Sequence, residues 1–66
     1  MNITCVEDMD ETMRNNFNAM LLEGAKRELI EGDELAGVFE ISYNVKFSRE
    51  MRELIPVLML EVRMGL

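Results

Sequence analysis

A strict alternation near the middle of the chain constrains the fold more than any other feature of the sequence. From Phe39 to Phe47 every second residue is apolar, and most of the residues between them are polar. Because successive side chains of a β-strand point to opposite faces, this period of two predicts a half-buried strand over residues 38–47. A second strand is predicted over residues 55–64, where every second residue from position 58 to 64 is apolar.

The two predicted strands are expected to pair as an antiparallel hairpin across the charged connection at Ser48–Leu54. Aligning their apolar faces favours a register that places Glu40 opposite Arg63, an attractive pair. Pro56 lies near the start of the second strand, and it suits an edge position or a bulge because proline cannot donate a hydrogen bond to the ladder.

The N-terminal part of the chain has a helical pattern. One stripe about 120° wide collects apolar side chains at helical spacing, which are Met9, Met13, Phe17, Met20 and Leu21. Asp8 and Asp10 are candidate N-caps. We expect one amphipathic helix over residues 9–31, because charged residues continue at salt-bridge spacing up to the stop signal Gly32. Gly24 offers the alternative of a C-cap, with a break before a second short helix.

Together these elements predict an α+β fold for a single domain over residues 1–66. One long amphipathic N-terminal helix packs on a two-stranded antiparallel β-hairpin, and residues 2–6 are either a frayed end or a short edge strand. The predicted core and oligomer contacts are Met13, Phe17, Met20, Leu21, Phe39, Ile41, Tyr43, Val57 and Met59.

Self-association is expected because the chain is short. With 66 residues and a lone cysteine, Cys5, the chain has no intrachain disulfide to support a small core, and chains below roughly 70–80 residues often need such support. Apolar side chains on both faces of the predicted last strand exceed what one helix can cover. The sequence therefore predicts a homo-oligomer, most simply a dimer.

Several functional classes fit the composition poorly. The chain has no histidine to act as a base or as a zinc ligand, and its serines have no obvious activating partner. We therefore expect no enzyme, no metal and no cofactor. One free cysteine and the lack of a stretch of about 20 apolar residues predict a cytoplasmic protein outside the membrane.

The acidic charge belongs to the N-terminal half. Residues 1–36 carry nine acidic against three basic residues, a balance of −6, whereas residues 37–66 carry four of each. This sign disfavours nucleic acid and favours a basic protein partner. The predicted partner-binding residues are Glu23, Glu28, Glu31, Asp33 and Glu34.

The order of patterns also resembles one group of known proteins. An acidic helix with Phe17, Leu21 and Leu22, followed by the alternating segment Phe39–Phe47 and by Val57–Met64, resembles small helix-plus-hairpin accessory proteins from early, replication-associated regions of bacteriophage genomes. The resemblance implies a small accessory protein without catalytic residues.

Two functions are therefore expected from the sequence. The first is a non-catalytic interaction module that binds, and so inhibits or recruits, another protein through its acidic surface. The alternative is a nucleic-acid-associated accessory protein that uses the basic residues of the predicted hairpin, which are Lys46, Arg49, Arg52 and Arg63.

Overall fold

Three helices make up most of the protein. The computed structural model describes residues 1–65, except for the side chain of Leu29. Within these residues lie α1 (Glu11–Ala25), α2 (Leu29–Tyr43) and α3 (Arg49–Arg63), a 3-10 helix over Val6–Asp8, and the two-residue strands β1 (Asn2–Ile3) and β2 (Lys46–Phe47). The strands pair in parallel. The predicted helix-plus-hairpin α+β fold is therefore wrong.

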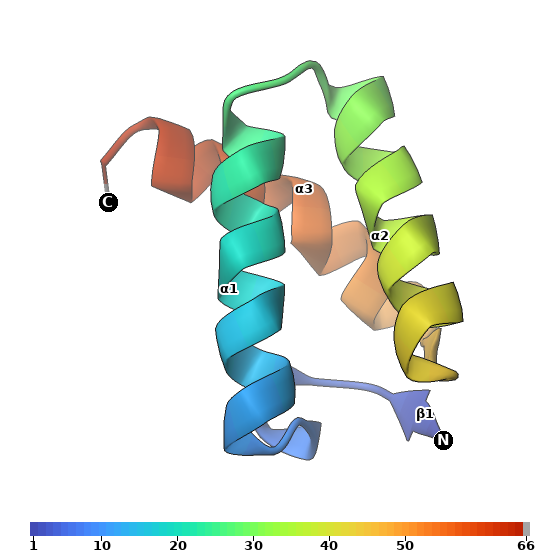
Figure 1. Ribbon diagram of the computed structural model, residues 1–66. Helices are drawn as coiled ribbons and strands as arrows, with labels where there is room; N and C mark the ends of the chain where they lie inside the picture. The colour runs from blue at the N-terminus through green and yellow to red at the C-terminus, as the bar shows by residue number, and fades with distance from the viewer. Residues whose placement is uncertain (66) are drawn as a thin grey trace.

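The helices form two layers. Figure 1 shows α1 and α2 side by side and running in opposite directions, with α3 crossing behind both of them. The short β1–β2 pair closes the end of the molecule near the N-terminus, where the Ser48 amide donates to the Ile3 carbonyl at 2.9 Å. This arrangement leaves one side of the α1–α2 pair covered by α3.

Helix α1 begins two residues after the predicted start and ends six residues before the predicted end. Asp10 is its N-cap, and the Asp10 carboxylate accepts a hydrogen bond from the Met13 amide at 2.8 Å. The predicted single helix over 9–31 is wrong, because the chain turns after Ala25 and starts α2 at Leu29. The break lies close to the alternative cap at Gly24. Arg63 supports it, since its guanidinium donates to the Ala25 carbonyl at 2.8 Å, a group that the helix end leaves without an intrahelical partner.

Helix α2 replaces the first predicted strand. It continues to Tyr43 and ends at Asn44, whose φ of 52° lies in the left-handed region that asparagine tolerates at helix ends. The apolar residues of α2 are distributed around the whole helix, so they match a period of two over part of their length. Only Lys46–Phe47 of the predicted strand is extended.

Helix α3 replaces the second predicted strand. Ser48 caps it, with its hydroxyl accepting from the Met51 amide at 3.1 Å. Met51, Ile55 and Met59 recur at i+4 spacing and are all buried, which is a helical pattern. Pro56 lies inside this helix, not at a strand edge. The predicted pairing of Glu40 with Arg63 does not form, because the Glu40 carboxylate binds Arg52 and the Phe47 amide instead.

The core has two parts. Phe17, Phe39, Phe47 and Tyr43 form one aromatic cluster, with ring centroids 4.5 to 6.0 Å apart. Where α3 crosses the other two helices, the Met59 side chain packs against the backbone of Gly24 and Gly32. A methyl group added at Gly24 would lie 2.6 Å from the Met59 sulfur, and one at Gly32 would lie 2.7 Å from it. These glycines therefore permit the close approach of α3.

Candidate interaction surface

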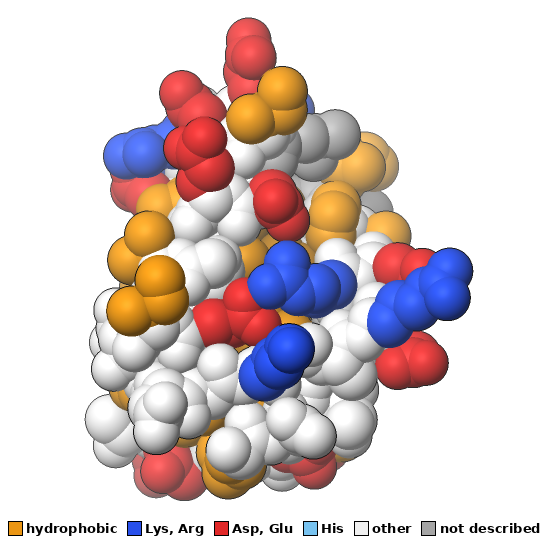
Figure 2. Space-filling view, turned by 90° about the vertical axis from the view of Figure 1, so that its right-hand side faces the viewer, with side chains coloured by type: hydrophobic (Ala, Val, Ile, Leu, Met, Phe, Trp, Pro, Cys, Tyr) orange, Lys and Arg blue, Asp and Glu red, His pale blue; other side chains and the backbone are white. Residues whose placement is uncertain are grey.

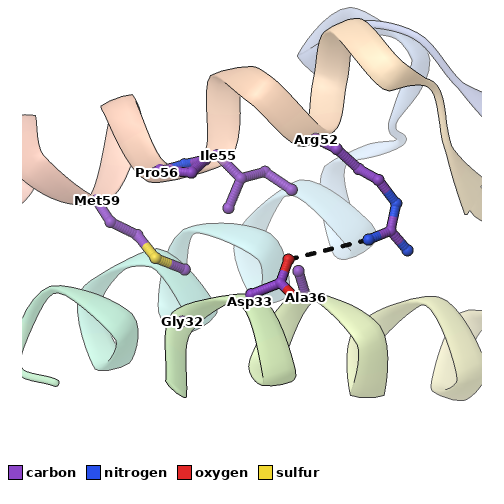
Figure 3. Close-up of a pocket in the computed structure, with 7 residues that line it drawn as sticks. All are labelled: Gly32, Asp33, Ala36, Arg52, Ile55, Pro56 and Met59. Atoms are coloured by element: carbon purple, nitrogen blue, oxygen red, sulfur yellow. Dashed lines mark ion pairs between the residues drawn. The ribbon is translucent and has the colours of Figure 1, made fainter. Parts of the chain in front are cut away.

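A small hollow lies between α2 and α3. Figure 3 shows the Met59 side chain pointing toward Gly32, while Arg52 extends across the gap toward Asp33, with 3.9 Å between their charged atoms. Ala36, Ile55 and Met59 line the hollow and are almost fully buried. We therefore attribute this hollow to packing between the two helices.

An open groove lies between α1 and α2, on the side away from α3. Its lining, as far as the structure describes it, comes from these two helices: Asn16, Ala19, Met20, Glu23, Leu35, Val38, Phe39, Ser42 and Tyr43. Met20 and Phe39 form its buried floor, whereas Ala19 and Val38 lie exposed on its walls. We call this feature the α1–α2 groove.

The walls of the α1–α2 groove follow helical spacing. Asn16, Ala19 and Glu23 lie on one face of α1. Glu31, Leu35, Val38 and Ser42 recur at i, i+4, i+7 and i+11 on one face of α2. Sequence reasoning missed these groove residues because it predicted a strand over 38–47. The helical spacing of positions 31, 35, 38 and 42 is the sequence signal that could have predicted this face of α2.

The five predicted partner-binding acids gather at one end of the molecule. Glu23 lies near the end of α1, Glu28 is the N-cap of α2, and Glu31, Asp33 and Glu34 lie in the first two turns of α2. All five are exposed, and Glu23 pairs with Arg27 at 2.9 Å. Figure 2 shows acidic side chains gathered at this upper end, with hydrophobic side chains among them. We call this cluster the acidic end.

Apolar side chains lie exposed along α2. Ile30 is 74% exposed, Val38 59% and Ile41 82%. Val38 and Ile41 are neighbours at i and i+3, whereas Ile30 lies at the acidic end and is separated from them by Glu34 and Gly37. Val38 also lines the α1–α2 groove. Exposed apolar side chains beside a groove are typical of a contact surface.

The predicted core residues divide according to the helical geometry. Buried positions are Met13, Phe17, Met20, Leu21, Phe39 and Met59. Tyr43 is half-buried, whereas Ile41 and Val57 are exposed. In a strand Ile41 would share a face with Phe39, and Val57 with Met59, but residues two apart point in widely different directions on a helix.

Most of the predicted nucleic-acid-binding residues interact with other groups of the protein. Arg52 pairs with Glu40 and Asp33, and Arg49 with Glu53 at 3.3 Å. The Arg63 guanidinium donates to the carbonyls of Ala25 and Arg27. Lys46 lies exposed on β2. These interactions leave a weak basic footprint for phosphate contacts.

Comparison with known proteins gives no identity: no family model, curated protein or solved structure matches this chain. Within the described part of the chain, no three acidic or thiol side chains converge as metal ligands would, and no helix has the length and apolar character needed to span a membrane. The resemblance to bacteriophage accessory proteins stays a prediction.

Proposed function

We propose that this protein is a non-catalytic interaction module that binds a basic protein through its acidic end. The observation that carries the proposal is the excess of five exposed carboxylates over Lys26 and Arg27 where α1 ends and α2 begins, with the exposed Ile30 side chain in the first turn of α2. Charges of one sign at the edge of a contact steer an oppositely charged partner, and an apolar side chain among them supplies desolvation energy.

The engaged basic residues favour a protein partner over nucleic acid. Arg52 and Arg63 are held by carboxylate or carbonyl groups of the protein itself, so contact with phosphate would require breaking those interactions. Self-association remains a prediction, although its original basis, the two apolar faces of a hairpin, is absent from the helical fold.

The test is a comparison of two charge-reversed variants. The first changes Glu28, Glu31 and Glu34 to Lys at the acidic end. The matched control changes Glu50, Glu53 and Glu61 to Lys, three exposed acids of α3, so both variants have the same net charge. Partner capture from the native cells is expected to fail with the first variant and to persist with the second. Equal loss of partner capture with both variants would mean that binding depends on net charge and not on the acidic end, and it would overturn the proposal.

A further inference from the structure

The α1–α2 groove has the dimensions of a helix-binding site. Its described lining runs from Asn16 to Glu23 on α1 and from Leu35 to Tyr43 on α2, which corresponds to a length of about 12 Å at 1.5 Å per residue, or two helical turns. The floor is apolar through Met20, Phe39 and Leu35, and the small side chains of Ala19 and Ser42 leave space between the walls. A further helix laid along the groove would complete a second layer over α1 and α2, as α3 does on the other side.

The charges around the groove favour an occupant of positive charge. Glu23 lines the groove from α1, where it also pairs with Arg27. Glu31 lies outside the described lining, one turn before Leu35 on the same face of α2. Among the described residues that line it, none is lysine or arginine. An occupant with basic residues flanking its apolar face would therefore meet complementary charge along the groove.

A second copy of the chain fits this groove poorly. Each copy has a formal net charge of −6, so two copies repel. The outer face of α3 exposes Leu54, Val57 and Leu60, but the helix carries equal numbers of acids and bases, and its arginines are held by Glu53, Glu40 and the Ala25 carbonyl. That face therefore offers the groove no excess of free basic side chains.

We propose that the α1–α2 groove binds a single amphipathic α-helix of a partner protein, with leucine-like anchors on the floor and basic side chains against Glu23 and Glu31. This inference rests on the proposed function and specifies the form of the partner. It corresponds to the helix-in-groove mode, in which anchors recur at i, i+3, i+4 and i+7.

The probe is a synthetic amphipathic peptide of about 14 residues, with leucines at i, i+3, i+4 and i+7 spacing and lysines elsewhere. One control peptide has the same composition in scrambled order, and a second replaces lysine by glutamate. Titration into ¹⁵N-labelled protein is expected to shift the amide signals of Ala19, Val38 and Ser42. Weaker binding of both controls, by about tenfold or more, would support the proposal.

A pair of variants tests the position of the site. Ala19→Arg places a long side chain in the groove, whereas Asn18→Arg adds the same charge to the neighbouring exposed position outside the groove lining. We expect the first to weaken peptide binding by about tenfold or more, because it fills the site of the anchors, and the second to change it by about twofold or less. Both variants are expected to retain the helical circular dichroism of the wild type.

Different failures have different meanings. Signals that shift at the acidic end and not in the groove would leave the proposed function standing and overturn the helix site. Equal affinity for the lysine and glutamate peptides in the groove would overturn the basic partner. Equal affinity for the scrambled peptide would overturn the helical form. Sedimentation of the wild type as a dimer that loses its association in Ala19→Arg would assign the groove to a second copy.

Discussion

The two sides of the α1–α2 pair use small residues in different ways. On the side that α3 covers, the Met59 side chain packs against Gly24 and Gly32 and fills the space that a larger residue would occupy. On the other side, Ala19 and Ser42 border a groove whose floor is Met20 and Phe39, and no described segment of the chain fills it. The comparison suggests that substitutions on the covered side change stability, whereas those on the open side change binding.

The largest effect is expected from placing a charge at the centre of the covered core. Phe17 is fully buried and contacts the rings of Phe39 and Phe47. Phe17→Asp would bury an unpaired carboxylate at a cost of several kcal/mol, against a total stability of about 5–15 kcal/mol for a typical domain. We expect the variant to be unfolded, as measured by thermal denaturation followed at 222 nm.

Ser42→Asp is the control on the open side. Ser42 is exposed and borders the groove, so its replacement is expected to change the midpoint of thermal unfolding very little. Similar midpoints for the two variants would mean that the covered and open sides do not differ as the structure indicates.

The same chemical change at two glycines should have opposite signs. Gly24→Ala forces the Met59 side chain, which is only 2% exposed, to move. Overpacking of this kind costs about 1–3 kcal/mol, which outweighs a gain of up to about 1 kcal/mol in the helix propensity of α1. Gly37 lies within α2, and a methyl group there would meet nothing within 4 Å. Gly37→Ala should therefore stabilise the protein by up to about 1 kcal/mol through helix propensity. Urea denaturation measures the free energy of unfolding of both variants. A stabilising effect of Gly24→Ala would contradict the close packing of Met59 against Gly24.

The N-terminal helix is the part of the fold that could be predicted from the sequence. Asp10 as a cap and the stripe through Met13, Phe17 and Met20 are local signals, and the tertiary structure keeps both of them. The end of the helix was missed because Gly24 was interpreted as a mid-helix residue. Its actual role depends on Met59, which lies 35 positions further along the chain, and a local pattern carries no information on such a contact.

The two strand predictions are wrong for related physical reasons. The apolar residues of α2 are spread around the helix among its acids, so those from Phe39 to Tyr43 also satisfy a period of two. Helix α3 has Ser48 as a cap and the i+4 series through Met51, Ile55 and Met59, but the alternation at positions 58–64 favours a strand over the same residues. The acidic end could be predicted because exposed charge follows from composition. The groove could not, because it exists only when α2 is a helix beside α1.

An intermediate effect is expected at the ion pair that joins α2 to α3. The Glu40 side chain is 11% exposed, accepts from the Phe47 amide at 2.8 Å and pairs with Arg52. Glu40→Ala removes both interactions and should cost about 1.5–3 kcal/mol, the range for hydrogen bonds to charged groups. Glu53→Ala is the control, because its pair with Arg49 is largely exposed and worth about 0–0.5 kcal/mol. Equal losses in urea denaturation would show that Glu40 does not help to hold the covered side together.

The smallest effect is expected outside both sides of the helix pair, in the segment before α1. The Asp8 carboxylate accepts hydrogen bonds from the amide and the hydroxyl of Thr4 at 2.8 and 2.7 Å, and these bonds lower the pKa of Asp8 below that of an ordinary aspartate. A lowered pKa stabilises the folded segment above the pKa of the unfolded chain, and this contribution disappears as the pH falls through the folded pKa. The Thr4 amide signal should therefore titrate at a lower pH than a free aspartate, and Asp8→Asn should abolish this titration without changing the midpoint of global unfolding. A titration at the ordinary aspartate pKa would mean that the Thr4 hydrogen bonds do not persist in solution.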